Sequence, residues 1–350
     1  MLNPLPPEPK LRFDSEIINL LSSADSSLYQ LTGLLGLFGE NHFIPRTLQI
    51  HEASNSLAID NYSISIEEYF TKLCTEEFLS IGTLNNYLSA SSIGLKLIKN
   101  VSHAGHIIKS IHNELVQEQS KSQLNELYRE GAVNNNAVDN KLVLPSPAEI
   151  PSLIEQFEKY IESDVSYPPL INASLIHAQF ELIHPFKNFN GLTGRILIQL
   201  HLNWKKRVVN NCLQISGLLF TRREEYFNRL KLLTTNEAWN EWIKFFLSII
   251  ISSSNKTIEI IKNLFRLEQS GYEKIIQSGS ATSTILQLYK YIFVQPVITI
   301  PHITKTLLLT KQTANIVVSK LLELGLLNEV TGKQRYRMYV NKNLLDVTRL

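Results

Sequence analysis

The sequence predicts a mainly α-helical protein with a small, basic C-terminal module. Leucine and isoleucine are abundant, only 14 of 350 residues are glycine, and most apolar side chains recur at helical spacing rather than in alternation. The length exceeds one average domain and suggests two or three units. From Ala281 to Leu350, nine Lys/Arg and three Asp/Glu give a net charge of +6, against −4 for the remainder. This asymmetry favours a separate module with a polyanionic partner, although a basic domain without one has the same composition.

Composition also restricts the class of protein. Hydrophobic residues make up 44% of the chain, which is typical of folded proteins rather than disordered ones. The two cysteines, Cys74 and Cys212, provide neither a disulfide framework nor a cysteine-based zinc site. The N-terminus has no apolar signal core, and the most apolar stretch, 242–254, is shorter than the roughly 20 residues that cross a membrane. We therefore expect a soluble, reduced, cytoplasmic protein.

The first half of the chain reads as successive helices. The predicted helices cover 48–61, 66–80, 84–99, 101–127, 146–163 and about 170–184. Ser146, Pro147 and Glu149 form the start signal of the fifth, because they supply a cap, a first-turn proline and a capping box. The Asn- and Gly-rich segment 128–147 precedes it and predicts a loop or hairpin.

The second half continues with helices and then changes. A helix that is apolar nearly all round begins near Thr193 or Gly194, and others cover 221–233 and 236–251, the last extending toward 258–269. A linker is expected at 279–283. Beyond it we expect a helix over 284–293, two helices over 299–327 joined near Thr310, and two β-prone runs around Thr331–Lys333. This order is the layout of a winged helix-turn-helix domain, with Lys311–Leu324 as its recognition helix.

The C-terminal module carries the candidate DNA contacts. They are Lys311, Gln312 and Asn315 on the recognition helix, and Lys333, Arg335 and Arg337 on the wing. Basic contacts of this kind bind phosphates without sequence preference. The module is also compatible with recruitment of a target protein or with dimerisation, which would make the chain a homodimer.

The segment 184–197, HPFKNFNGLTGRIL, combines features that suit a phosphate. Pro185 ends one helix at His184, and the next helix begins after a short loop. The start of a helix offers free N–H groups and a positive dipole end to an anion, and Asn190-Gly191 allows the close turn. Arg195 in the first helical turn is unfavourable unless an anion binds there. His184 lies across this loop and titrates near neutrality when unperturbed, which makes it a candidate base.

Two other interpretations of this segment remain open. A histidine before proline at a helix end is often structural. Alternatively, His177, Glu181 and His184 lie at i, i+4 and i+7, on one helical face, where two imidazoles and a carboxylate could bind zinc or iron.

The segment resembles the signature of the Fic family, HPFx(D/E)GNGRxGR, and the similarity extends over about residues 40–340. The resemblance implies a helical Fic core with a short β-hairpin flap within 131–145, followed by the winged helix. The implied domains are 1–110, a helical region with an inhibitory helix at about 50–61; 111–278, the Fic core; and 279–350. Asn188, Phe189 and Leu192 depart from the family's Asp/Glu, Gly and first Arg.

The resemblance also implies an activity, the transfer of AMP from ATP to a hydroxyl of a target protein, which can be the chain itself. His184 would be the base, Asn190 and nearby N–H groups would hold the α-phosphate, and Arg195 the outer phosphates. The implied nucleotide-binding residues are Phe186, Asn188, Asn190, Gly191, Leu192, Thr193, Gly194, Arg195 and Tyr226. Mg²⁺ or Mn²⁺ would bind weakly at Asn188, whose amide lacks the usual charge.

A second match is to the family's inhibitory motif, (S/T)xxxE(G/N), at Ser56, Asp60 and Asn61. By resemblance, Asp60 would pair with Arg195 and block productive ATP binding. Aspartate is one methylene shorter than the usual glutamate, so the pair must lie closer or be weaker. The alternative to an autoinhibited transferase is a weak or inactive Fic-fold regulator that binds nucleotide or a partner and uses its winged helix on DNA.

Overall fold

The computed structural model describes residues 2–7, 11–39, 42–62, 64–76, 81–100, 103–116, 128–131, 142–163, 167–235 and 238–347. They form two compact units. The first consists of Met1–Phe38, Leu48–Ser63 and Thr83–Thr257, and the second of Gly39–Thr47, Ile64–Gly82 and Ile258–Leu350. Helices α2 (Phe43–Ile59) and α11 (Trp239–Gln277) each contribute more than one residue to both units. The division into 1–110, 111–278 and 279–350 follows chain order rather than compactness, and it stays a prediction.

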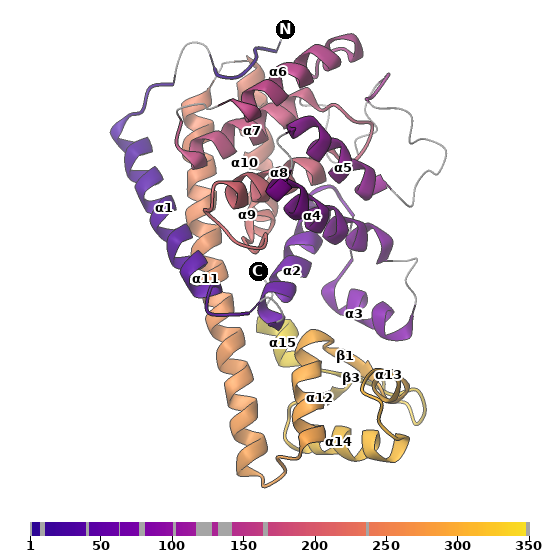
Figure 1. Cartoon of the computed structure of the whole chain (residues 1–350). Coiled ribbons are helices and arrows are strands. Elements are labelled where there is room, and N and C mark those ends of the chain that lie inside the picture. The colour runs from indigo at the N-terminus through magenta and orange to yellow at the C-terminus, as the bar shows by residue number, and fades with distance from the viewer. Residues whose placement is uncertain are drawn as a thin grey trace. The chain divides into compact units, whose positions relative to one another are not determined.

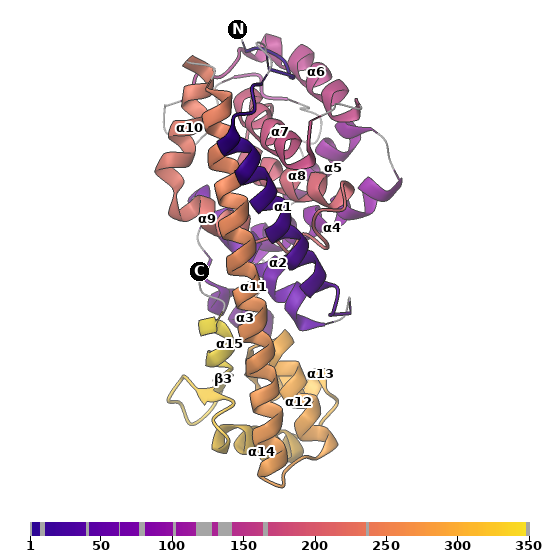
Figure 2. The same cartoon turned by 90° about the vertical axis from the view of Figure 1, so that its left-hand side faces the viewer.

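The regular secondary structure of the first unit is helical in all of its described residues. Besides its parts of α2 and α11, it contains α1 (Ser15–Leu35), α4 (Gly82–Asn100), α5 (Ala104–Val116), α6 (Ile150–Glu162), α7 (Pro169–Ile183), α8 (Asn190–Trp204), α9 (Ile215–Thr221) and α10 (Arg223–Thr235). The helix α1 lies along α11 in both views (Figure 1, Figure 2), and Lys244 of α11 forms ion pairs with Asp14 and Glu16 at its start.

The helices α7 and α8 form the centre of this unit. They pack against each other along their length, with α5, α6 and α10 around them. Every residue of α7 from Leu170 to Ile183 is buried, as expected for a helix whose apolar side chains are not restricted to one face. Trp242 of α11 is fully buried and donates from Nε1 to the carbonyl of Ser174, at 2.9 Å. The loop between α7 and α8 thus connects two helices that are buried in the centre of the unit.

The second unit combines helices with a small sheet. It contains α3 (Ile66–Thr75), α12 (Ser283–Val294), α13 (Ile300–Thr306), α14 (Lys311–Glu323) and α15 (Lys342–Val347), together with β1 (Val297–Thr299), β2 (Asn328–Glu329) and β3 (Met338–Val340). The strand order is β1-β3-β2 and both pairings are antiparallel, with Val340 opposite both Val297 and Asn328.

Threonine caps start three helices of the second unit. In each case the threonine hydroxyl accepts a hydrogen bond from the backbone N–H three residues on, which satisfies one of the free donors at the helix start. The caps are Thr282 of α12, Thr299 of α13 and Thr310 of α14. Thr310 therefore marks the turn between α13 and α14, where the sequence predicted one.

Most predicted helices are present, with some differences in their bounds. The capping pair at 146–149 forms, with the Ser146 backbone N–H and hydroxyl both donating to Glu149. The helix α8 begins at Asn190 rather than near Thr193, which corrects the prediction. The strand β1 was not predicted, because its three residues look like the start of the following helix. Residues 117–127 of the predicted helix 101–127, and 132–141 of the predicted hairpin flap, lie outside the described residues. Within the described ranges, the structure contains no helix that is both long and apolar enough to cross a membrane.

Candidate functional site at the loop between α7 and α8

His184 ends α7 in a left-handed conformation, with φ 50°. Its N–H still donates to the carbonyl of Phe180, at 2.9 Å, so the last turn of the helix is closed. Its own carbonyl accepts a hydrogen bond from Nε of Arg129, at 2.8 Å. Positive φ is uncommon for residues other than glycine and persists where the surroundings hold it in place. The histidine is buried, and its backbone is fixed from both sides.

Arg129 joins three separate backbone segments. Besides its bond to His184, its backbone N–H donates to the carbonyl of Pro185, and its Nη2 donates to that of Pro145, at 2.6 Å. Pro145 precedes the start of α6. The histidine loop is therefore attached to the chain segment that leads into α6. No local pattern in the sequence singles out Arg129, because its partners are 16 and 55 residues away.

The loop after His184 is closed by Asn190. The side chain of Asn190 accepts a hydrogen bond from the N–H of Phe186, at 2.8 Å, and donates one to its carbonyl, at 2.7 Å. His112 supports the same loop from α5, because its ring stacks on Phe186 and its Nε2 bonds to the carbonyl of Asn188, at 3.1 Å. The amide of Asn190 thus shapes the loop, a role that was not predicted for it beside the expected phosphate contact.

The structure shows how phenylalanine is accommodated at the position before α8, where the family signature has glycine. Phe189 stands where the signature has glycine, and it adopts a left-handed conformation, with φ 59°. Glycine reaches this region without steric cost, whereas other residues are strained by about 1–3 kcal/mol. Phe189 is buried and its ring lies against Tyr62, with ring centroids 5.7 Å apart. Packing of the ring offsets the unfavourable backbone.

The N-terminus of α8 has the form expected for an anion site. The first intrahelical bond runs from the N–H of Thr193 to the carbonyl of Phe189, at 3.0 Å, so the amides of residues 190–192 face out of the helix end. Because the helix starts at Asn190, Arg195 is its sixth residue. The prediction that Arg195 lies in the first turn was wrong, and its side chain reaches back toward the helix start instead.

Arg195 is 1% exposed and is held by the end of α2. Its Nε donates to Oγ of Ser56, at 2.7 Å, and its Nη2 donates both to the carbonyl of Ser56 and to Oδ2 of Asp60, each at 2.9 Å. Burial disfavours the charge of Arg195, but Asp60 together with Tyr226 and Glu181 holds its pKa above the ordinary value. The guanidinium is therefore a buried, fully charged group.

The carboxylate of Asp60 lies against the start of α8. A Cβ atom added to Gly191 would come within 2.9 Å of both carboxylate oxygens and 2.8 Å of Nη1 of Arg195. Only glycine leaves room for this arrangement. The sequence predicted an anion at this helix end, and in this structure the nearest anionic group is a side chain of the same chain.

A buried polar cluster surrounds Arg195. Burial raises the pKa of Glu181 to about 7, and the carboxyl lies close to Gly194. Burial lowers the pKa of His177 to about 3, and its Nε2 is 2.9 Å from the hydroxyl of Tyr226. On α2, Glu52 accepts from the N–H and hydroxyl of Ser216, and burial raises its pKa to about 7. Glu52, His112 and Arg129 were not among the predicted site residues.

The remaining predicted residues are placed as follows. Leu192 is 0% exposed, so the position of the family's first arginine points into the core. Gly194 and Thr193 are buried within α8, whereas Asn188 is half-buried. Asn61 follows Asp60 with φ 61°, a conformation that asparagine tolerates. In the second unit, all six candidate DNA contacts are exposed.

The described side chains do not fit a tightly bound divalent cation. Asn188 can offer one neutral oxygen, whereas the nearby carboxylate of Asp60 is paired with Arg195. Throughout the described ranges, no group of three or more His, Cys, Asp or Glu side chains could hold a metal. The triad His177, Glu181 and His184 is included in this result. Nδ1 of His184 lies 3.3 Å from the carbonyl of Glu181, and His177 faces Tyr226.

Comparisons with known proteins agree with the resemblance. Residues 105–202 match the model of the Fic/DOC family. Among curated proteins, a probable protein adenylyltransferase of Aquifex aeolicus is 27% identical over 150 residues, covering 41% of this chain and 43% of that protein. Protein adenylyltransferase Fic of Drosophila melanogaster is 23% identical over 278 residues, covering 73% and 49% respectively. The chain thus spans less than half the length of these relatives.

A solved structure has a similar fold over nearly the whole chain. It is a Fic family protein from Desulfovibrio desulfuricans G20, with a TM-score of 0.60 and 18% identity, and the alignment covers 96% of this chain and 98% of that one. The helices α5 to α8 fall in the region of the family match and hold the loop from His184 to Asn190. Residues 105–202 therefore match the Fic/DOC family model, and the fold around them is similar to that of a Fic family protein.

Proposed function

We propose that the chain is a Fic-type protein adenylyltransferase, which transfers AMP from ATP to a hydroxyl of a target protein or of the chain itself. The observation that carries the proposal is the geometry of one loop. His184 ends α7 six residues before the start of α8, and the N-terminus of α8 carries the outward-facing amides and lies against the guanidinium of Arg195. The names of the curated relatives support the same reaction.

The protonation state of His184 suits a general base. Burial lowers its pKa to about 4, so the ring is neutral at pH 7. Nδ1 lies within hydrogen-bonding distance of the carbonyl of Glu181, which favours the tautomer with its proton on Nδ1 and its basic lone pair on Nε2. In the proposed step, Nε2 takes the proton of the target hydroxyl, whose oxygen bonds to the α-phosphorus while pyrophosphate leaves. The helix amides would stabilise the charge that develops on the phosphate.

We further propose that the end of α2 restrains this activity. The carboxylate of Asp60 occupies the region at the start of α8 where a phosphate would bind, and Arg195 is engaged by Ser56 and Asp60. A nucleotide phosphate must displace this carboxylate before it reaches the guanidinium. Asn188 and Leu192 weaken the site further, through the missing carboxylate and the missing arginine.

The test is transfer of label from ATP carrying a labelled α-phosphate, with Mg²⁺ or Mn²⁺. We expect weak labelling by the wild-type chain, stronger labelling by Asp60→Gly, and none by His184→Ala. Glu67→Ala, which removes an exposed carboxylate on α3, is the matched control and should behave as wild type. If neither the wild type nor Asp60→Gly labels any protein in a lysate while an active Fic enzyme does, the proposal is wrong.

A second candidate function rests on the second unit. Its helix order, its antiparallel sheet and the exposed basic residues of α14 and the β2–β3 connection support a winged helix that binds DNA. Under this alternative the Fic domain is a weak or inactive regulator that senses nucleotide. The full-length chain should then shift duplex DNA in a salt-dependent manner, and replacing Lys333, Arg335 and Arg337 with alanine should weaken the shift. Absence of any shift at low salt would exclude this function.

A further inference from the structure

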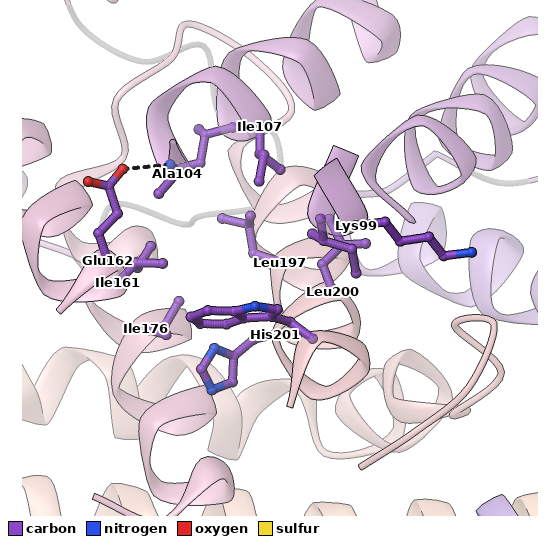
Figure 3. A pocket seen from close by; sticks show the side chains of 12 residues that line it. Lys99, Ala104, Ile107, Ile161, Glu162, Ile176, Leu197, Leu200 and His201 are labelled. Carbon is purple, nitrogen blue, oxygen red and sulfur yellow. Dashed lines mark hydrogen bonds between the residues drawn. The ribbon is translucent and has the colours of Figure 1, made fainter. Parts of the chain in front are cut away.

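Away from the histidine loop, the two units carry features of different kinds. The first contains a cavity of about 450 Å³, lined mainly by aliphatic side chains, Ile107, Leu197 and Leu200 among them (Figure 3). Contact with an aliphatic wall has no direction, so such a wall does not distinguish one apolar molecule from another. The second unit instead presents polar and basic side chains on an exposed helix face, and hydrogen bonds from such a face can select a partner.

That face belongs to α14, the second helix of the expected helix-turn-helix pair. The opposite side of α14 packs against α12 and α13 and buries Ala314, Val317, Val318 and Leu321. In helix-turn-helix proteins the second helix lies in the major groove, and the residues of its N-terminal half contact the edges of the bases. Under the DNA-binding alternative proposed above, the exposed residues near the start of α14 therefore face the bases.

The exposed residues of α14 lie along one side of the helix. They recur at intervals of three or four residues, which places them on a common face. From the start of the helix they are Lys311, Gln312, Asn315, Ile316 and Ser319. Ile316 is 61% exposed, although it lies between two carboxamides and a hydroxyl. The face thus offers two amides, one aliphatic side chain and one lysine.

The charge around this face suits a polyanion. From Ile300 to Leu322 the sequence contains no Asp or Glu, so α13 and most of α14 carry no carboxylate. The first acidic residue of α14, Glu323, is paired with Lys320, at 3.0 Å. The connection between β2 and β3 adds three exposed basic residues, which are Lys333, Arg335 and Arg337. Duplex DNA can therefore approach α13 and α14 without repulsion from an unpaired carboxylate of these helices.

The side-chain types on the face match one kind of base pair. A carboxamide donates to N7 of adenine and accepts from its N6 amino group, and an aliphatic side chain packs against the methyl group of thymine. Asn315 donates one amide hydrogen to the carbonyl of Lys311, at 2.7 Å, and its other amide hydrogen is the one that a contact with adenine requires. Guanine is read chiefly by Arg or Lys, and α14 contains no arginine.

We propose that α14 reads A·T base pairs in the major groove of duplex DNA, with Gln312 and Asn315 bonding to adenine and Ile316 packing against a thymine methyl group. Lys311 and the basic residues of the β2–β3 connection contact phosphates, which position the protein but carry no sequence information. This inference rests on the DNA-binding alternative proposed above, and it adds the class of sequence that the helix selects.

Selection by the full-length protein from short duplexes of random sequence should enrich a site rich in A·T pairs. On the enriched duplex, 7-deazaadenine in place of adenine removes N7 and should weaken binding about 10-fold. Uracil in place of thymine removes the methyl group and should weaken it about 4-fold, as expected for one buried methyl.

Variants assign each effect to its side chain. Replacing both Gln312 and Asn315 with alanine should remove the sensitivity to 7-deazaadenine, whereas Asn343→Ala, on the exposed side of α15, should keep it. Ile316→Ala should remove the sensitivity to uracil, whereas Ile18→Ala, on the exposed side of α1, should keep it. Circular dichroism establishes that each variant is folded.

The outcomes separate this inference from the DNA-binding function on which it rests. Binding at low salt without enrichment of A·T pairs, or with equal affinity for the natural and the modified duplexes, overturns the inference and leaves DNA binding in place. Absence of any binding at low salt overturns both. Should a variant of α14 not fold, the enriched sequence and the two modified duplexes still decide the matter with the wild-type protein.

Discussion

Asp60→Asn tests whether the carboxylate at the start of α8 takes the place of a nucleotide phosphate. The substitution removes one negative charge and keeps the shape and an oxygen acceptor. In the wild type, that charge balances Arg195, which is 1% exposed, while Asp60 itself is 16% exposed. We expect opposite effects on the protein alone and on its complex with ATP, because the same change exposes a buried cation and vacates an anion site.

The cost to the protein alone follows from burial. Removing one partner of a buried ion pair costs about 3–5 kcal/mol. Two bonds from Arg195 to Ser56 remain, and the asparagine oxygen still accepts one from the guanidinium, so we expect the lower end of the range, about 3 kcal/mol. For a unit of this size, that corresponds to a fall in Tm of about 6–12 °C.

The effect of ATP should reverse this loss. A ligand that binds only the folded state stabilises it by about 2.7 kcal/mol when its concentration is 100 times its Kd. In Asp60→Asn, the phosphates no longer compete with a carboxylate, and Kd for ATP should fall about 10–100-fold, the equivalent of one charged hydrogen bond. At millimolar ATP, the variant should regain most of its lost Tm.

The assay is thermal unfolding of the full-length wild type, Asp60→Asn and Glu67→Gln, each with and without ATP. Glu67→Gln neutralises an exposed carboxylate and should match the wild type in both conditions. A rise in Tm with ATP that is equal in the wild type and in Asp60→Asn would show that the carboxylate and the nucleotide do not share a site. The proposed restraint by α2 would then be refuted.

Three further predictions concern the loop and its surroundings. Arg129→Lys loses the hydrogen bonds to the carbonyls of His184 and Pro145, and kcat of AMP transfer should fall about 10–100-fold with little change in KM for ATP, as measured by steady-state labelling. Leu192→Arg, which matches the family signature, should lower the stability in urea rather than raise activity, because Leu192 is 0% exposed and the change buries a charge. Asn188→Asp should increase activity in Mn²⁺ without a loss of stability, because it supplies a carboxylate ligand. The free energy of unfolding should increase with pH between about 4 and 6.5, because the buried His184 and His112 have a folded pKa of about 4 and take up protons on unfolding. Glu52 and Glu181, whose folded pKa is raised to about 7, have the opposite effect on stability over this range. Replacing both glutamates with glutamine should therefore make the increase with pH steeper.

The sequence was sufficient to predict the helix ends and turns that short-range residue patterns determine. The end of α7 at His184 follows from Pro185, the short 3-10 turn Pro147–Glu149 that leads into α6 follows from Ser146 and Glu149, and the turn before α14 follows from Thr310. In each case one residue type has a strong physical preference for one position, and its partners lie within four residues. Such signals survive in a single sequence because they need no knowledge of the tertiary structure.

The start of α8 shows where local reasoning fails. Thr193 and Gly194 look like a helix start, but the helix begins at Asn190. The side chain of Asn190 bonds the backbone of Phe186, and the residue before it has a left-handed conformation. The three supports of the histidine loop that were not predicted, His112, Arg129 and the strained Phe189, act through contacts that only the folded chain brings together. Nothing in the spacing of residues 112, 129 and 189 indicates that they share a neighbour.

Gly191 links the prediction of an anion site to the restraint by α2. From the sequence, glycine at this position meant that a phosphate can approach the backbone closely. In the structure, the space that a Cβ atom would fill is bounded by the carboxylate of Asp60 and by Nη1 of Arg195. The same small residue thus permits either occupant, and both occupants carry the negative charge that a helix start and a buried guanidinium require. The chain satisfies this requirement with its own aspartate, so under the proposed restraint a nucleotide phosphate must displace an internal anion to bind. Gly191→Ala separates the two uses: it should displace the Asp60 carboxylate and exclude phosphate alike, so the variant should lose stability without gaining ATP binding, unlike Asp60→Asn.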